Sequence, residues 1–193
     1  MSLGEFLTRV VRILDSTGVP YMLTGSLAAA YFATPRATQD IDFVIDADAP
    51  RIDRLVDALL DAGFYVSRDA AHSALESASQ FNAIDPETGW KVDLIVRKGR
   101  LYSVTEFGRR KPAHVLGVEV SLTSIEDLII AKLEWSQLGD SDLQRRDVAQ
   151  LLEAGWDSID QAYVKRWVEN LGLQVAWRDA LARLRGREGG SQP

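Results

Sequence analysis

The stretch Thr24–Asp46, TGSLAAAYFATPRATQDIDFVID, is the part of the chain from which the predicted fold and function follow. It begins with a Gly-Ser pair after the apolar run 21–23, continues through small residues that suit a helix, and ends in a second apolar run, 43–45. A helix that begins at Gly25 and Ser26 has unpaired backbone N–H groups, and together with the helix dipole these favour a bound phosphate. An ordinary strand-to-helix turn with a capping serine is the alternative.

Asp40 and Asp42 flank Ile41 at the head of the second apolar run. Residues two apart on a strand point to the same face, so we expect the two carboxylates side by side while Ile41 and Phe43 enter the core. Close carboxylates repel one another, so either one of them is protonated or a hard cation is bound. Oxygen ligands suit Mg²⁺ or Mn²⁺. The alternative is a pair of solvated residues in a turn and at a strand edge, although aspartate is depleted in strands.

A third carboxylate, Asp93, lies within the later apolar run 90–96. It alternates with bulky apolar neighbours and is therefore expected to face away from them. With Asp40 and Asp42 it would complete a metal-binding triad. Such a triad beside a phosphate-binding turn indicates metal-assisted phosphoryl or nucleotidyl chemistry, in which two metals activate a hydroxyl and steady the leaving pyrophosphate.

These motifs resemble the nucleotidyltransferase superfamily of DNA polymerase beta, over roughly residues 19–155. The resemblance rests on Gly25-Ser26, on Arg36-x-Thr38-x-Asp40-x-Asp42, and on the run WKVDLIV that contains Asp93. Within the superfamily the chain most resembles the AbiEii-like group of nucleotidyltransferase toxins. The resemblance implies a nucleoside triphosphate substrate and Mg²⁺ or Mn²⁺ as cofactor. It also places Arg36 and Thr38 beside the nucleotide, the alternative being turn or surface residues.

A lysine within an apolar helix, followed by an Arg/Lys-Asp pair, recurs in the AbiEii-like group and is matched here by Lys132 and Arg146-Asp147. The resemblance implies that Lys132 contacts the triphosphate and neutralises charge on the leaving pyrophosphate, while Asp147 orients it or its neighbours. The chain departs from the family pattern at Gln150, where a second aspartate is usual. A snorkelling surface lysine, or an ordinary ion pair between the two helices, is the alternative.

Size and composition are those of an ordinary globular protein: of 193 residues, 46% are hydrophobic and 26% charged, enough to bury a core. A net charge of −6 disfavours unaided binding to long nucleic acid. The absence of cysteine excludes disulfides, thiol catalysis and zinc-thiolate sites. The N-terminal segment is amphipathic and charged, unlike a signal peptide, and no apolar run is long enough to span a bilayer. We therefore expect a cytoplasmic protein without a membrane partner.

Apolar periodicity predicts an α+β fold: a small mixed β-sheet of the nucleotidyltransferase type flanked by helices, followed by a C-terminal helical bundle. The expected organisation is a core at 1–122, a helical region at 123–185 and a disordered Gly-rich tail at 186–193. The segment 67–80 suits either a short helix or a mobile loop. Strands are expected at 21–23, 40–45, 64–66, 81–84, 90–96, 114–116 and 118–122. Helices are expected at the N-terminus up to 15–18, and at 26–32, 48–63, 103–110, 124–136, 141–154, 160–171 and 175–185.

The sequence thus predicts a metal-dependent nucleotidyltransferase that moves a nucleoside monophosphate from a triphosphate to a hydroxyl group. By resemblance, the acceptor is an RNA, such as tRNA, or a protein, and the setting is a toxin–antitoxin pair with the antitoxin as a separate protein. Two alternatives stay open: a catalytically silent module of the same fold that binds nucleotide or a partner, and a phosphotransferase that attacks the γ-phosphate. Three intact carboxylates argue against the silent module.

Overall fold

The computed structural model describes residues 1–34, 38, 40–139 and 141–188. Its contacts divide the chain into two compact units. The sheet unit comprises Met1–Leu27 and Ala37–Thr123, and the helical unit comprises Ala28–Arg36 and Ser124–Pro193. The division into a core at 1–122, a helical region at 123–185 and a tail at 186–193 stays a prediction.

In the described part of the chain, the sheet unit contains one seven-stranded mixed sheet with the strand order β3-β4-β5-β2-β1-β7-β6. Strand β2 is central, since the parallel strand β5 lies on one side and the antiparallel strand β1 on the other. Strands β1 and β7 are also parallel, and the remaining neighbours are antiparallel. The strands are β1 Tyr21–Thr24, β2 Asp40–Ile45, β3 Tyr65–Val66, β4 Gln80–Ile84, β5 Lys91–Val96, β6 Lys111–Val115 and β7 Val118–Leu122.

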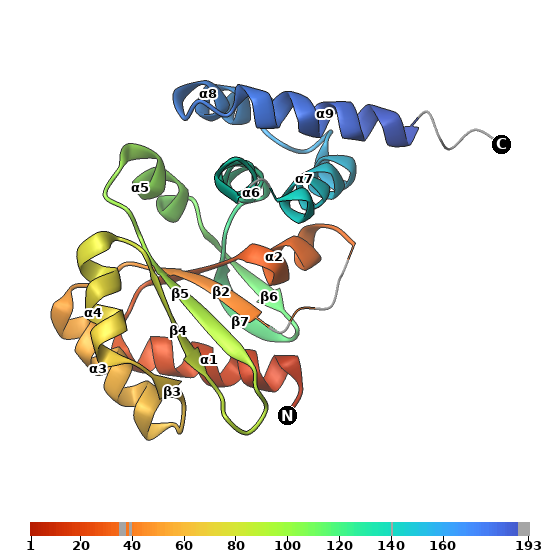
Figure 1. Ribbon diagram of the computed structural model, residues 1–193. Helices are drawn as coiled ribbons and strands as arrows, with labels where there is room; N and C mark the ends of the chain where they lie inside the picture. The colour runs from red at the N-terminus through yellow and green to blue at the C-terminus, as the bar shows by residue number, and fades with distance from the viewer. Residues whose placement is uncertain (35–37, 39, 140, 189–193) are drawn as a thin grey trace. The chain divides into compact units, whose positions relative to one another are not determined.

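Strand β2 forms where the alternation of apolar and polar residues predicts a strand. Ile41, Phe43 and Ile45 are fully buried on one face, whereas Asp40 and Asp42 lie on the other face and are partly exposed. The helices α1 (Leu3–Thr17), α3 (Ala49–Asp61) and α4 (Arg68–Ser77) pack next to one another along the sheet (Figure 1). The face of β2 that carries the carboxylates is therefore the one with polar groups available for chemistry.

Local capping signals set the ends of these helices. Ser2 and Glu5 form a reciprocal capping box before α1, and Gly18 closes that helix in the left-handed conformation, with φ 65°. Asp48 caps α3 by accepting a hydrogen bond from the N–H of Arg51. Ser67 caps α4 in the same way, so the segment that suited either a helix or a loop is a helix.

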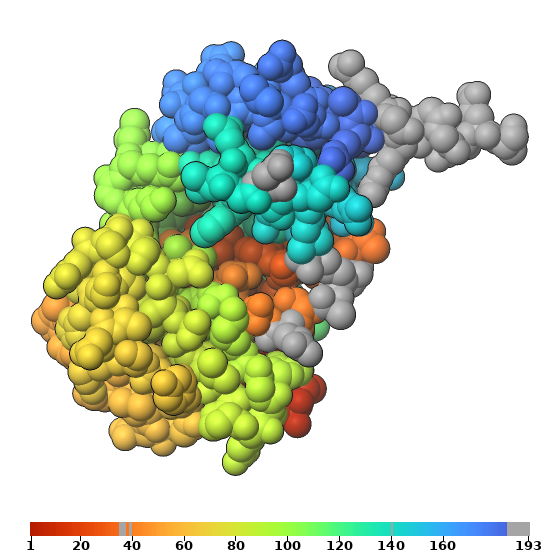
Figure 2. Space-filling model, in the orientation of Figure 1, coloured from red at the N-terminus to blue at the C-terminus, as the bar shows by residue number. Residues whose placement is uncertain are grey.

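Ion pairs join α3 to α4 at the surface. The guanidinium of Arg68 bonds to both Asp53 and Asp57, and the Nε2 atom of His72 lies 2.9 Å from Asp53 Oδ1. Figure 2 shows the two helices side by side on the surface, in orange to yellow. Because these pairs are exposed to solvent, each adds little to the free energy of unfolding.

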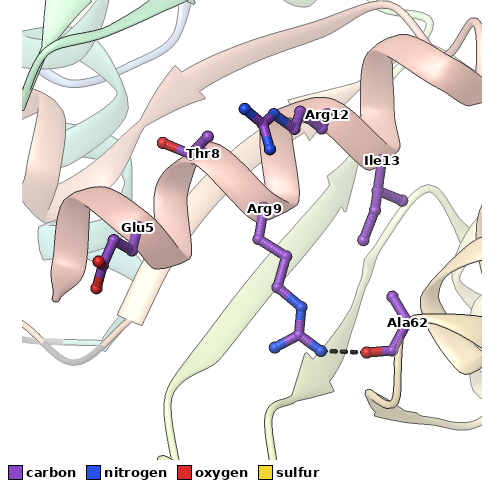
Figure 3. A pocket seen from close by; sticks show the side chains of 6 residues that line it. All are labelled: Glu5, Thr8, Arg9, Arg12, Ile13 and Ala62. Atoms are coloured by element: carbon purple, nitrogen blue, oxygen red, sulfur yellow. Dashed lines mark hydrogen bonds between the residues drawn. The ribbon is translucent and has the colours of Figure 1, made fainter. Parts of the chain in front are cut away.

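A buried carboxylate, Asp85, fastens the turn between β4 and β5 to α1. Asp85 accepts hydrogen bonds from the Thr88 hydroxyl at 2.7 Å and from the Glu87 N–H at 3.2 Å. Arg9 of α1 lies 3.4 Å from the same carboxylate, stacks over the Phe64 ring and donates to the carbonyl of Ala62. Figure 3 shows that last bond and the surface pocket around Arg9, which contains none of the predicted site residues.

The helical unit has its own buried polar anchor at Asp127. This carboxylate is fully buried and accepts hydrogen bonds from the Tyr163 hydroxyl at 2.6 Å and the Ser124 hydroxyl at 2.7 Å. A Cβ atom on Gly155 would lie 2.6 Å from Ile125 Cδ1, so the last residue of α7 lies against the side chain of the first residue of α6. The helices of this unit are α6 Ile125–Gly139, α7 Asp142–Gly155, α8 Gln161–Asn170 and α9 Gln174–Glu188.

Two shorter helices, α5 and α2, belong wholly or partly to the sheet unit. Helix α5 spans Leu101–Gly108 in the sheet unit, and α2 spans Gly25–Phe32, with its first three residues in the sheet unit. Helix α9 continues to Glu188, beyond the end expected at residue 185. The rest of the tail that was expected to be disordered, 189–193, lies outside the described residues. No helix within the described ranges is both long and apolar enough to cross a membrane.

Replacement of Asp85 tests the anchor between the turn and α1. We expect Asp85→Ala to lower the free energy of unfolding by about 2 kcal/mol, because the donors on Glu87, Thr88 and Arg9 lose their acceptor in a buried place. Urea denaturation of the purified protein measures the change. Asp61→Ala, which removes an exposed carboxylate at the end of α3, is the control and should change it by less than about 0.5 kcal/mol. Equal effects of the two substitutions would contradict the anchoring role.

Candidate active site

The three predicted carboxylates lie on one face of two neighbouring central strands. Asp42 of β2 is the register partner of Asp93 of β5, and Asp40 is the partner of Lys91. Neighbouring strands lie about 4.8 Å apart, so the side chains at 42 and 93 project from adjacent positions. The alternative that Asp40 and Asp42 belong to a strand edge is wrong, because β2 is central in the sheet.

Lys91 supplies positive charge inside this acidic cluster. Its Nζ atom lies 2.9 Å from Asp93 Oδ2 and 3.6 Å from Asp40 Oδ2. The hydrogen bond to Asp93 raises the pKa of Lys91 above its ordinary value, against the effect of burial, and the negative charges of the three aspartates act in the same direction. Lys91 is therefore a cation throughout the physiological pH range and offsets part of the repulsion among the carboxylates.

Asp93 is the most deeply placed of the three carboxylates. The residue is 7% exposed, and although its Oδ2 atom bonds to Lys91, its Oδ1 atom is buried and accepts no hydrogen bond from the described residues. A buried, unbonded carboxylate oxygen costs free energy, and such atoms are rare in native proteins. This oxygen is the natural acceptor for a proton or a cation that enters the cluster.

The turn at Gly25 lies directly against Asp42. Gly25 has a φ of 66°, and a Cβ atom on it would lie 1.9 Å from Asp42 Oδ2 and 2.7 Å from Asp42 Cβ. The N–H of Ser26 donates to Asp42 Oδ2 over 3.4 Å. Thr24 is the register partner of Asp42 in the antiparallel pair β1–β2. The beginning of α2 is thus brought beside the carboxylates, as a phosphate-binding turn next to a metal site requires.

Thr38 lies next to the start of β2. Its hydroxyl donates to the carbonyl of Asp40 at 2.9 Å and accepts from the N–H of Asp40 at 3.3 Å. These bonds hold the backbone at the first carboxylate, and the contact of Thr38 with a nucleotide stays a prediction. Arg36, predicted to contact phosphate, lies outside the described residues.

Lys132 and Asp147, the other two predicted site residues, are partners in the helical unit. Lys132 is 3% exposed, and its Nζ atom donates to Asp147 Oδ2 at 2.7 Å and to Gln144 Oε1 at 3.1 Å. The alternative of a snorkelling surface lysine is wrong, and the ion pair between the two helices is present. The roles predicted for the two residues toward the triphosphate stay predictions.

A metal ion fits the chemistry of the carboxylate cluster. Among the described residues, no group of three or more histidine, cysteine, aspartate or glutamate side chains is arranged to hold an ion. The cluster nevertheless offers only oxygen donors, which suit Mg²⁺ and Mn²⁺, and it already holds one cation, the ammonium of Lys91. The unbonded Oδ1 of Asp93 adds a further free donor. The metal roles of Asp40, Asp42 and Asp93 stay predictions that these donors support.

The cation Lys91 is the site residue that sequence reasoning missed. The signal was present, because Lys91 is two residues before Asp93 in a strand and must share its face. Its partner Asp40 comes from a strand about fifty residues earlier, and only the parallel register of β2 and β5 brings the two together.

Comparison with solved structures places the fold among nucleotidyltransferases. The solution structure of the antibiotic-resistance factor ANT(2'')-Ia matches with a TM-score of 0.58 and 14% identity over 97% of each chain. The lincosamide antibiotic adenylyltransferase LnuA, in its lincomycin-bound crystal structure, matches with a TM-score of 0.54 and 13% identity over 78% of this chain and 96% of that one. An antigenic nucleotidyltransferase-like protein from Paracoccidioides brasiliensis matches with a TM-score of 0.52 and 20% identity over 91% and 92%. No protein-family model matches the sequence, and no curated protein matches it.

These matches confirm the predicted fold class. The chain has a nucleotidyltransferase-like fold, in which a mixed sheet is flanked by helices and helices follow it in the sequence. At 20% identity or less, the matches show the fold alone. They do not bear on the resemblance to the AbiEii-like group.

Replacement of Gly25 tests its approach to Asp42. Gly18 has nearly the same φ, 65°, but a Cβ atom on it would have nothing within 4 Å, so Gly18→Ala measures backbone strain alone, about 1 kcal/mol. We expect Gly25→Ala to lower the free energy of unfolding by about 2 kcal/mol more than Gly18→Ala does. Rotation of the Asp42 side chain can move its carboxylate away, but it cannot relieve the clash with the Asp42 Cβ atom. Urea unfolding of the two variants measures the difference. Equal losses would show that Gly25 is not constrained by the carboxylate.

Replacement of Lys132 tests the buried ion pair. Lys132→Met leaves the Asp147 carboxylate buried without its lysine partner, so we expect a loss of about 3 kcal/mol or more in the free energy of unfolding. The double variant Lys132→Met/Asp147→Leu removes both charges and should recover most of that loss. Thermal and urea unfolding measure both variants. If Lys132 also acts on the triphosphate, the stable double variant will bind nucleotide more weakly than the wild type, and unchanged nucleotide binding would leave the ion pair as its role.

Proposed function

We propose that this protein is a metal-dependent nucleotidyltransferase. The observation that carries the proposal is the close contact between the Gly25–Ser26 turn and Asp42, which is itself the register partner of Asp93. A helix start that binds phosphate thereby adjoins a carboxylate pair that binds a hard cation. The nucleotidyltransferase-like fold supports the same chemistry.

The residues that would hold the metal are Asp40, Asp42 and Asp93, which share one face of β2 and β5. A bound Mg²⁺ or Mn²⁺ would polarise the phosphoryl oxygens and stabilise the negative charge of the leaving pyrophosphate.

The chain's own groups would bind and orient the reactants. The N–H groups at Gly25 and Ser26, at the positive end of the α2 dipole, would bind oxygens of the triphosphate. A carboxylate oxygen of the cluster that does not hold the metal would accept the proton of the acceptor hydroxyl as its oxygen attacks the α-phosphorus. A bond forms between that oxygen and the α-phosphorus, the bond to the bridging oxygen breaks, and pyrophosphate leaves. By resemblance, Lys132 and Asp147 act on the triphosphate, and Arg36 and Thr38 contact the nucleotide.

The proposed acceptor is a hydroxyl group, and three classes of molecule could carry it: an RNA, a protein or a small hydroxylated molecule. An RNA, such as tRNA, or a protein follows from the resemblance to AbiEii-like toxins, together with a separate antitoxin and a cytoplasmic location. A small hydroxylated molecule is the further candidate, because LnuA is a lincosamide antibiotic adenylyltransferase and ANT(2'')-Ia has been crystallised with adenylyl-2''-tobramycin. The net charge of −6 favours the small molecule or protein over long nucleic acid.

Two alternative functions of the same fold can be told apart by the products that are released. A silent module would bind nucleotide without turnover, although three mutually repelling carboxylates have no use in such a protein. A phosphotransferase would release nucleoside diphosphate, whereas a nucleotidyltransferase releases pyrophosphate.

Transfer of label from α-labelled nucleoside triphosphates tests the proposal. Each of the four nucleotides is incubated with the protein, Mg²⁺ or Mn²⁺, and in turn cellular RNA, cellular protein, an aminoglycoside and a lincosamide. We expect label on one acceptor class, release of pyrophosphate, and loss of transfer on chelation of the metal. Asp42→Asn should lower the rate by a factor on the order of a hundred or more, since it removes a charged ligand next to the reacting phosphate.

Asp48→Asn is the matched control for that variant. Asp48 caps α3, asparagine caps helices equally well, and the residue lies outside the carboxylate cluster, so we expect the wild-type rate. Release of nucleoside diphosphate would replace the proposal by a phosphotransferase. Metal-dependent nucleotide binding without transfer to any acceptor would replace it by the silent module.

A further inference from the structure

We propose that Lys91 is the resident cation of the carboxylate cluster, and that a divalent metal binds there only by displacing the Lys91 ammonium from Asp93. The inference deepens the proposed function and rests on its metal site. In the metal-free protein, Lys91 of β5 would offset the negative charge of the carboxylates and hold Asp93 in position.

The ammonium of Lys91 lies close to two of the three carboxylates that would hold a metal. Lys91 Nζ is 2.9 Å from one oxygen of Asp93 and 3.6 Å from one oxygen of Asp40, so it bridges two of the three carboxylates. It reaches them from the same strand face, because the register pairs Lys91 with Asp40 and Asp42 with Asp93. A divalent ion that bound the same oxygens would meet the ammonium at close range, and like charges at that range repel strongly.

Burial explains why the cluster needs a cation in the absence of metal. The Asp93 side chain is 11% exposed, and Asp42 lies directly beside it as its register partner on the adjacent strand β2. Two negative charges so placed repel one another at short range. The ammonium of Lys91, 2.9 Å from Asp93 Oδ2, offsets part of that repulsion.

The lysine also leaves one donor unused. Asp93 bonds to Lys91 through Oδ2 alone, while its Oδ1 atom is buried and without a hydrogen-bond partner among the described residues. The long lysine side chain, 30% accessible, can swing away from Oδ2, and a metal at this carboxylate would then have both oxygens of Asp93 as donors. The exchange of an ammonium for a metal at one carboxylate lowers the apparent metal affinity, since the lysine bond must be broken.

Metal titration of three proteins tests this exchange. Calorimetry with Mn²⁺ alone is carried out on the wild type, Lys91→Met and Lys98→Met. Lys98 is an exposed lysine shortly after β5, so its replacement removes one lysine charge without touching Asp93. We expect Lys91→Met to bind Mn²⁺ at least about tenfold more tightly than the wild type, with a lower melting temperature in the metal-free state. Lys98→Met should match the wild type in both measurements.

Chemical modification of the wild type gives a second test that needs no variant. Limited acetylation with acetic anhydride, followed by peptide mass spectrometry, reports how free each lysine ammonium is. We expect saturating Mn²⁺ to raise the acetylation of Lys91 several-fold and to leave that of Lys98 unchanged. Unchanged or lower acetylation of Lys91 would overturn the inference.

The titration separates failure of this inference from failure of the proposed function. If the wild type and Lys91→Met bind Mn²⁺ with equal affinity, or if the variant binds more weakly, the displacement is overturned and the metal site remains. If neither protein binds Mn²⁺, the proposed metal-dependent function and the inference fall together.

Discussion

Repulsion among three carboxylates is the constraint on which the candidate site depends. Asp40, Asp42 and Asp93 lie on the same face of two central parallel strands, where aspartate is otherwise disfavoured. The sheet tolerates them because Lys91, on the same face, bonds to Asp93 and lies close to Asp40. The opposite face of β2, with Ile41, Phe43 and Ile45 fully buried, contributes the hydrophobic stability that holds the strand in place.

A second close approach connects this cluster to the turn at Gly25 and Ser26, which we propose binds the nucleotide. Gly25 brings the backbone at the start of α2 against Asp42, at a distance that any Cβ atom would prevent. Its positive φ turns the chain from β1 into the helix, so one residue meets both requirements. The N–H groups of a helix start and the carboxylates of the proposed metal site are thereby neighbours within one compact unit. Their proximity is what makes phosphoryl transfer the chemistry best supported here.

Local patterns predicted the elements, whereas charge partners depended on the register. Alternation identified β2 and β5 and the face of their aspartates, and Gly18 and Asp48 lie at helix ends close to those expected. The pairing of Asp40 with Lys91 joins residues far apart in the chain, which periodicity cannot reveal. The sequence left two ordinary interpretations of Lys132 open beside the predicted triphosphate contact, a lysine that snorkels to the surface and an ion pair between the two helices. Only the packing of α6 on α7 brings it to Asp147.

The central claim is that the carboxylate face of β2 and β5, together with the turn at Gly25, binds a metal–nucleotide complex. A crystal structure with Mn²⁺ and a non-hydrolysable nucleoside triphosphate, with anomalous data collected at the manganese edge, tests it most directly. We expect an anomalous peak within about 2.2 Å of oxygens from Asp42 and Asp93, with phosphate oxygens on the N–H groups at Gly25 and Ser26. Manganese bound away from these aspartates, or a triphosphate bound away from the Gly25 turn, would contradict it.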